Sequence, residues 1–343
     1  MKVFITGIAG HIGSRFALWL LGNVADIRIV GVDNLSSGFL ENVPDDPRVT
    51  FIQGTLGEAM PLEEVIGDAE YVFHFAAYAA EALSPFIRCF DCTNNLVGGL
   101  EVLNACLNLG SVKRFVFTSS AAVYGGTAGL VDGAYIERDF RRPRDPYGVT
   151  KAAMEANLEI AADQHGLDYC ILRPHNLYGP GQNGWQPYRN VIAKWMVRTL
   201  EDRPKEIFGD GSQIRAFTYA EDVMPCLWRA ATYEKARNQI INLGSSQTVT
   251  LRRLAALCNH VCGGRYVCVP PRYEARTIYC TADKAEAVLG QPTVAQETDL
   301  ETGLAQTWAW MRDAWQRYPD RRGAKRPAPY EVLRGMPDSW KGI

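Results

Sequence analysis

The sequence has no long apolar run, no marked excess of charge of one sign and no cysteine pattern typical of a metal site. No apolar stretch approaches the ~18 residues of a membrane span. The formal net charge of the 343 residues is −2, with both signs mixed along the chain, so neither nucleic acid nor an anionic membrane is expected as a partner. The nine cysteines are scattered. The closest pairs, Cys89/Cys92 and Cys258/Cys262, lack a second ligand pair and are interpreted as free thiols, with no metal expected.

The first residues already form a predicted strand, so no signal peptide is expected. Together with the unpaired cysteines, this predicts a reduced, cytoplasmic globular protein.

The first half of the chain alternates short apolar runs with helical patterns. The runs stay apolar throughout, which is typical of parallel strands covered on both faces. This βαβ pattern predicts an α/β fold with an open, doubly wound parallel sheet. Strands are expected at Lys2–Ile5, Ile27–Val32, Val49–Ile52, Tyr71–Phe75, Arg114–Thr118 and Tyr169–Leu172, and helices at Ile12–Leu21, Leu62–Ile66, Phe86–Leu109 and Tyr147–His165.

From about residue 175 this rhythm changes, and a smaller α+β unit is expected. A long loop rich in Gly, Pro and aromatic residues comes first. Helices are then expected at Val191–Leu200, Ala220–Ala231, Leu251–Val261, Ala282–Leu289 and Leu300–Trp315, with short strands at Glu206–Phe208, Ile240–Leu243 and Tyr266–Val269. Residues 317–343 are polar and contain several prolines, which predicts a tail with little regular structure, either loose or laid on the surface.

Glycines at positions 7, 10 and 13 lie between the first predicted strand and the first predicted helix. This spacing suits a tight turn whose backbone amides approach a diphosphate at the helix N-terminus. A second strand ends at Asp33, about 20 residues past the last glycine, which favours a dinucleotide site over an ordinary glycine-rich turn. The Asp33 carboxylate suits a ribose 2′-hydroxyl, and residues 34–37 offer no cation for a 2′-phosphate, so NAD is expected rather than NADP.

Tyr147 and Lys151 are spaced i, i+4 and would lie on one face of a helix. An ammonium near a phenol favours the phenolate, so we expect Lys151 to lower the pKa of Tyr147 and make it a usable base. A surface Tyr beside a solvated Lys is the alternative. Upstream, Ser119 and Ser120 follow a buried strand, where a hydroxyl can bond a substrate oxygen or simply cap a turn.

Six motifs occur in the order found in one family: TGIAGHIG, HFAA, SSAAVYG, YGVTK, RPHNLYGP and RAFTY. On these the chain resembles the extended short-chain dehydrogenases/reductases. Within them it is similar to the nucleotide-sugar epimerases that act on UDP-glucose and UDP-galactose, over about residues 1–315. The resemblance implies an NAD-binding Rossmann domain (1–175), a domain that binds a nucleoside diphosphate sugar such as a UDP-hexose (176–316, with some chain exchange) and a polar tail (317–343). Homodimers are usual in the family.

The resemblance also implies roles for individual residues. Ser120, Tyr147 and Lys151 would be catalytic. Contacts with NAD are implied for Gly7, Gly10, His11, Ile12, Gly13, Asp33, Asn34, Ser37, Gly38, Thr55, Leu56, Phe75, Ala76, Ala77, Asn95, Thr118, Tyr147, Lys151 and Pro174. Contacts with the substrate are implied for Ser120, Tyr147, Asn176, Asn190, Phe208, Arg215, Arg272 and Cys280. Asn176 and the two arginines would hold the diphosphate, and Phe208 would lie near the base.

The implied reaction borrows a hydride. Tyr147 takes the C4 hydroxyl proton, the hydride passes to NAD, the 4-keto sugar turns over, and the hydride returns to the other face. Two departures from the family, Thr55 for Asp and Ala79 for Lys, remove contacts to NAD and predict weaker retention of it.

Three alternatives remain at this point. Related dehydratases and decarboxylases carry an acid where this chain has Ala121 and Ala122, so these reactions are disfavoured because alanine moves no proton. A reductase with exchangeable cofactor, or an epimerase acting at another carbon, remains possible. A non-catalytic dinucleotide sensor is the third alternative, although it would not need to keep Ser120, Tyr147 and Lys151 together.

The position of Cys280 suggests a gate on the sugar's C2 side. In the resembling epimerases a bulky Tyr at this position leaves room for a hydroxyl only. The smaller thiol side chain of Cys280 would leave enough volume for an N-acetyl group. Two alternatives remain: Cys280 is a small buried residue, or Tyr279 blocks the site instead.

Overall fold

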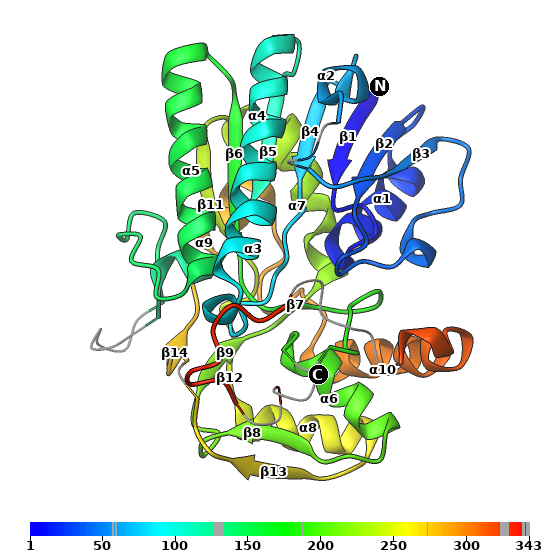
Figure 1. Cartoon of the computed structure of the whole chain (residues 1–343), viewed down its shortest axis with the longest axis vertical. Helices are drawn as coiled ribbons and strands as arrows, with labels where there is room; N and C mark the ends of the chain where they lie inside the picture. The colour runs from blue at the N-terminus through cyan, green and yellow to red at the C-terminus, as the bar shows by residue number, and fades with distance from the viewer. Residues whose placement is uncertain are drawn as a thin grey trace.

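Seven parallel strands form the central sheet of the computed structural model (Figure 1). The structure describes residues 1–56, 58, 60–126, 134–186, 188–272, 274–322, 329–337 and 340. The sheet order is β11-β6-β5-β4-β1-β2-β3, and every neighbouring pair is parallel. The strands are β1 (Lys2–Thr6), β2 (Arg28–Asp33), β3 (Val49–Gln53), β4 (Tyr71–His74), β5 (Arg114–Thr118), β6 (Tyr169–Pro174) and β11 (Gln239–Leu243). The predicted doubly wound α/β sheet is confirmed.

Helices cover both faces of this sheet, which explains why its strands are apolar throughout (Figure 1). One face packs α1 (His11–Asn23), α7 (Ala220–Thr232) and α9 (Asp283–Leu289) against the strands. The other packs α2 (Leu62–Ile66), α4 (Gly98–Leu109) and α5 (Pro146–His165). The helix expected at Phe86–Leu109 is one run of α3 (Arg88–Cys92), the π-helical η3 (Thr93–Val97) and α4.

The strand β11 corrects one expectation. Its residues were expected in the smaller unit, but they pair with β6 at the edge of the central sheet. A backbone excursion of more than sixty residues separates the two strands in sequence, so only long-range packing could reveal the pairing.

The second lobe is built on α6 (Val191–Leu200), α8 (Leu251–Cys262) and α10 (Leu300–Arg317), which share a hydrophobic core with Ile207 of β8. It contains seven short strands in the described residues, of which β8 and β13 were predicted from the sequence and the other five were not. The seven are β7 (Leu177–Tyr178) with β10 (Thr218–Tyr219), β8 (Lys205–Phe208) with β13 (Tyr266–Val269), and β9 (Ile214–Ala216) between β12 (Thr248–Thr250) and β14 (Thr277–Ile278). The remaining short helices are η1 (Leu40–Asn42), η2 (Ser84–Phe86), η4 (Ala121–Tyr124), η5 (Glu234–Ala236) and η6 (Pro319–Arg321).

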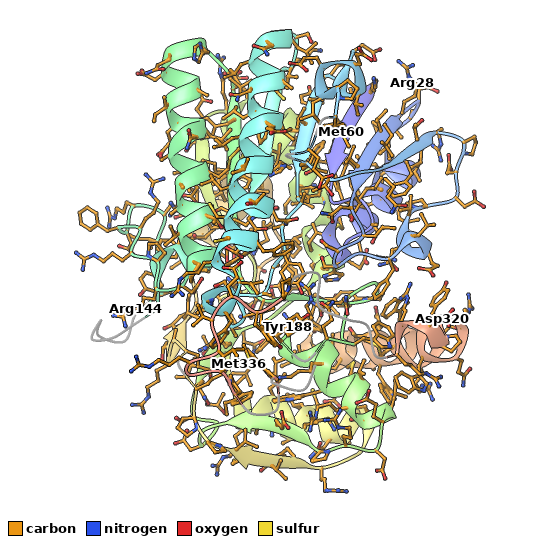
Figure 2. All side chains as sticks on the ribbon, in the orientation of Figure 1. Arg28, Met60, Arg144, Tyr188, Asp320 and Met336 are labelled. Carbon is orange, nitrogen blue, oxygen red and sulfur yellow. The ribbon has the colours of Figure 1, made fainter. Side chains whose placement is uncertain are left out.

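The described part of the C-terminal tail is not loose. Met336 and Trp340 are buried in a cluster with Tyr78 and Tyr188. Figure 2 shows Tyr188 and Met336 between the two lobes. The Glu331 carboxylate accepts hydrogen bonds from two backbone amides of α3, at 2.9 and 3.1 Å. The tail is therefore a strap that helps join the lobes, which corrects the expectation of a loose or superficial segment.

Candidate active site

A cavity of about 980 Å³ lies beyond the carboxyl ends of β1, β2, β4 and β5, and extends to the second lobe. In doubly wound sheets this edge is where ligands bind. Of the residues singled out from sequence, twenty-two line it: Gly7, Gly10, His11, Ile12, Gly13, Asp33, Asn34, Ser37, Leu56, Phe75, Ala76, Ala77, Thr118, Ser120, Tyr147, Lys151, Pro174, Asn176, Asn190, Phe208, Arg215 and Arg272.

The glycine turn is packed too closely for side chains. Gly7 has φ +74°, and a Cβ on Gly13 would lie 2.2 Å from the carbonyl oxygen of Gly7. The N-cap of α1, Gly10, brings no side-chain cap, so the first-turn amides keep their hydrogen-bonding capacity for an anion. This cradle fits the diphosphate of a dinucleotide.

Asp33 is fixed beside this turn. Its carboxylate accepts hydrogen bonds from the amides of Ala9 (3.0 Å) and Leu35 (2.8 Å). Burial raises the pKa of Asp33, and these amide bonds oppose the shift. Gly38 does not line the cavity, but a Cβ there would lie 2.6 Å from the backbone of Ala9, so its role is to let this loop approach the turn.

Hydrogen bonds tie the strand ends to the helix that carries Lys151. The Thr118 hydroxyl donates to the carbonyl of His74 (3.2 Å), and the Thr118 carbonyl accepts from the Lys151 ammonium (2.8 Å). The ammonium lies 5.7 Å from the centre of the Tyr147 ring, so the predicted i, i+4 pair is on one face of α5. Asp145 caps this helix by accepting from the Gly148 amide at 2.7 Å.

The pKa of Tyr147 is raised, not lowered. Burial is the main cause, followed by the negative charges of Glu81, Asp91 and Asp145, while a hydrogen bond with the Ser120 side chain opposes the shift. The expectation that Lys151 lowers this pKa is therefore wrong for the protein alone. Burial in turn lowers the pKa of Lys151 to about 7, which reduces the positive charge it can offer.

The two arginines expected at the diphosphate line the cavity, and each is held by the protein. Arg272 pairs with Glu274 at 2.9 Å, and its guanidinium lies 4.4 Å from the centre of the Phe208 ring. Arg215 donates to the carbonyls of Ile214 and Arg276, at 2.8 and 3.1 Å. These contacts orient two cations at the second-lobe end of the cavity.

Lys194 adds a third cation that sequence reasoning missed. It lines the cavity, is only 5% exposed, and its ammonium lies 5.5 Å from the centre of the Phe208 ring. Within the described ranges no acceptor lies in hydrogen-bond or ion-pair distance of this ammonium, and burial lowers its pKa to about 7. A buried charge without a partner is costly, so this end of the cavity suits an anion.

Four residues singled out from sequence do not line the cavity. Besides Gly38 these are Thr55, whose neighbours Gly54 and Leu56 line it, together with Asn95 and Cys280. The Asn95 side chain is hydrogen-bonded within the protein, where its oxygen accepts from the Tyr78 amide at 2.7 Å. The neighbouring Asn94 faces the cavity instead, because η3 is π-helical and shifts the register of the helix.

Cys280 is a correction. A backbone β-bridge between Cys280 and Tyr135 holds Cys280 in a buried cluster with Val123 and Tyr124. Its side chain has no exposed surface. It therefore does not act as the expected gate in this structure. Ile278, two residues earlier, lines the cavity.

Other lining residues had no usable signal in the sequence. Glu81 follows an apolar strand in a loop without a motif, and Trp340 belongs to a segment outside the resemblance. Trp340 reaches the cavity because the tail packs against the β4–α3 loop, where it shares a buried cluster with Tyr78.

Residues 3–244 match the model of the NAD dependent epimerase/dehydratase family. The chain belongs to this family. A putative UDP-glucose 4-epimerase of Methanocaldococcus jannaschii is 30% identical over 318 residues, which are 91% of this chain and 98% of that protein. The structure of UDP-glucose 4-epimerase of Thermotoga maritima with UDP-glucose is similar with a TM-score of 0.83, at 32% identity, over 92% of this chain and 100% of the other. UDP-glucuronic acid 4-epimerase of Bacillus cereus, solved with UDP-glucuronic acid and NAD, has a TM-score of 0.82 at 26% identity, over 91% and 99% of the chains.

This member of the family uses NAD as its cofactor, and the glycine cradle and Asp33 fit that group. The described residues contain no helix long and apolar enough to cross a membrane. In the same residues, no three or more His, Cys, Asp or Glu side chains gather as metal ligands would.

Proposed function

We propose that this enzyme inverts C4 of a UDP-hexose, interconverting UDP-glucose and UDP-galactose or their N-acetylated forms, through a 4-keto sugar. The observation that carries the proposal is the arrangement of one cavity. Tyr147, Ser120 and Lys151 line it beside the strand ends, where the nicotinamide would lie, and Lys194, Arg215 and Arg272 form a basic end in the second lobe. A nucleotide sugar has the matching arrangement, with an anionic diphosphate at one end and a hexose at the other.

The residues of the chain would divide the work as follows. The basic end anchors the diphosphate while the hexose turns over between its two orientations. Tyr147 takes the proton of the C4 hydroxyl and later returns it, and the Ser120 hydroxyl, which lines the same cavity, would orient that oxygen. Lys151, held by the Thr118 carbonyl, fixes the ribose next to the phenol. Bound NAD would supply the hydride acceptor and, when oxidised, a positive charge that favours the phenolate.

Dehydration is the alternative within the family. It needs an acid beside the ketone, and Ala121 and Ala122, which line the cavity where related dehydratases carry that acid, have no proton to give. We also propose a homodimer, as the resemblance implies, which sedimentation would test.

The test incubates the purified enzyme with UDP-glucose and, separately, with UDP-galactose, and identifies the products by NMR. Formation of the C4 epimer from each, with absorbance of enzyme-bound NADH appearing on addition of sugar, supports the proposal. A 4-keto-6-deoxy product would establish a dehydratase instead, and net consumption of added NADH would establish a reductase. The Tyr147→Phe variant serves as the inactive control.

A further inference from the structure

The catalytic end of the cavity carries a carboxylate that the proposed mechanism does not use. Glu81 lies in the loop after β4 and lines the cavity together with Tyr147. Glu81 is exposed at the wall of the cavity, and partial desolvation there, together with the negative charge of Asp145, raises its pKa to about 7. Among the described residues no side chain or amide donates to this carboxylate; the Glu81 atom that accepts is its backbone carbonyl.

The position of Glu81 relative to Tyr147 is fixed by Ser84. The Ser84 hydroxyl donates to the Glu81 carbonyl at 2.8 Å and accepts from the Tyr147 amide at 3.2 Å. The loop is therefore latched to the first turn of α5. On its other side the Glu81 carboxylate is within electrostatic reach of Arg215 and Arg272. Glu81 thus lines the same cavity as the catalytic phenol and the cations of the basic end, and it interacts electrostatically with both.

A hexose bound for reaction must span this same interval, because its diphosphate lies at the basic end and its C4 hydroxyl at Tyr147. We propose that Glu81 is a specificity-determining residue that excludes sugars bearing a carboxylate, so that the substrate is an uncharged hexose rather than a uronic acid. The inference rests on the proposed function, since it places a nucleotide sugar in the cavity. Like charges in a partly desolvated site repel strongly, so the Glu81 carboxylate would exclude a uronic acid and leave binding of an uncharged hexose unaffected.

Two arginines near the β4–α3 loop make contacts within the protein, although the buried Nη2 of Arg189 has no hydrogen-bond partner among the described residues. Arg189 stacks on the Tyr78 ring at 4.3 Å, and it donates to the Gln186 side chain (2.6 Å) and the Ala79 carbonyl (3.2 Å). Arg88 donates to the Pro85 carbonyl at 2.8 Å. Arg144 and Arg334 also line the cavity, but their side chains are exposed to solvent, where their charge is screened.

Two further carboxylates strengthen the effect. Asp145 and Asp91 act on the same phenol as Glu81, and like Glu81 they raise its pKa. Of these carboxylates, Glu81 and Asp145 line the cavity. Because the pKa of Glu81 is raised to about 7, the repulsion of a uronate carboxylate should grow as the pH rises through that value, whereas the hydroxymethyl group of glucose would meet hydrogen-bond acceptors that it can satisfy.

The test measures kcat/KM and, by calorimetry, Kd for UDP-glucose and UDP-glucuronate with the wild-type enzyme, Glu81→Gln and Glu81→Ala. Glu64→Gln is the matched control, because it removes one exposed carboxylate on α2, outside the cavity. We expect the wild type to prefer UDP-glucose by at least ~10-fold, and both Glu81 variants to remove most of that preference through tighter binding of UDP-glucuronate. The control should keep the wild-type ratio.

The inference is overturned if the wild type binds UDP-glucuronate as well as UDP-glucose, or if neither Glu81 variant changes the ratio. The second variant guards against a fold defect, which would weaken both sugars together and leave their ratio intact. Conversion of UDP-glucose with an unchanged ratio refutes this inference alone. Failure of the wild type to bind or convert either sugar refutes the proposed function and removes the substrate on which the inference depends.

Discussion

Replacing Lys194 with Met should make the free enzyme more stable and its nucleotide binding weaker. The ammonium of Lys194 is buried at the basic end of the cavity and has no acceptor among the described residues. Met has a similar shape and no charge, so it removes the cost of burying that charge without leaving a large cavity. The same change removes a cation that a diphosphate would use.

The magnitude follows from the pKa of Lys194, which falls from its ordinary value of 10.5 to about 7. Burial is the main cause, and repulsion by Arg272 adds to it. Each pKa unit corresponds to ~1.4 kcal/mol, so at pH 7 the depressed pKa costs up to about 4 kcal/mol of folding stability. We expect Lys194→Met to recover about 2–4 kcal/mol. The expected loss of UDP affinity is at least ~10-fold.

The sign of the pH dependence gives a second readout. The folded pKa lies below the unfolded one, so between pH 7 and 10.5 the unfolded state binds the extra proton. The contribution of Lys194 therefore makes wild-type stability rise with pH in that window. In Lys194→Met this contribution should be absent, so the gain over wild type should shrink as the pH is raised.

Lys205 provides a matched control. It is also fully buried, but its ammonium donates to the Asn259 side chain (2.9 Å) and the Gly263 carbonyl (2.6 Å). Lys205→Met leaves these two acceptors without a donor and should therefore destabilise the enzyme by about 1–3 kcal/mol. Urea unfolding without nucleotide and calorimetry with UDP measure both variants. The reasoning is refuted if both substitutions destabilise alike, or if Lys194→Met leaves UDP affinity unchanged.

Three further predictions use other parts of the site. Tyr147→Phe should lower turnover at least ~10²-fold with little change in Tm, since only a hydroxyl is removed; near wild-type turnover would rule out Tyr147 as the base. Gly13→Ala should abolish retention of NAD, because its Cβ would lie 2.2 Å from the Gly7 carbonyl oxygen; NAD released from the denatured variant in wild-type amount would contradict this. Cys280→Tyr should lower Tm by overpacking a buried cluster, and an unchanged Tm with altered sugar preference would restore the gate.

Much of the fold could be predicted because the sequence patterns that indicate it lie within short stretches of the chain. An unbroken apolar run predicts a buried parallel strand, as Val3–Ile5 does within β1. The glycine turn shows in its spacing, since the crowding of Gly13 against the Gly7 backbone is decided within seven residues, whereas the crowding of Gly7 comes from Phe75 and Ala76 after β4. The Tyr147–Lys151 pair needs only the period of one helix.

Predictions failed where a register shift or a long-range contact decided the outcome. Asn94 rather than Asn95 faces the cavity because the helix is π-helical at that point. Cys280 points into a cluster because of its bridge to Tyr135, which is far away in sequence. The raised pKa of Tyr147 reflects burial and carboxylates from other elements, neither of which its helical spacing reveals.

The sequence by itself determined the parallel sheet, the dinucleotide turn and the catalytic pair, because each depends on residues close together in the chain. Only the tertiary structure decided what surrounds them. It placed β11 in the central sheet, packed Trp340 against the β4–α3 loop, and put Lys194 and Glu81 in the same cavity with no side-chain hydrogen bond or ion pair to the residues that the structure describes. The electrostatic character of that cavity is set by distance and desolvation between groups remote in sequence, and no local pattern encodes either quantity.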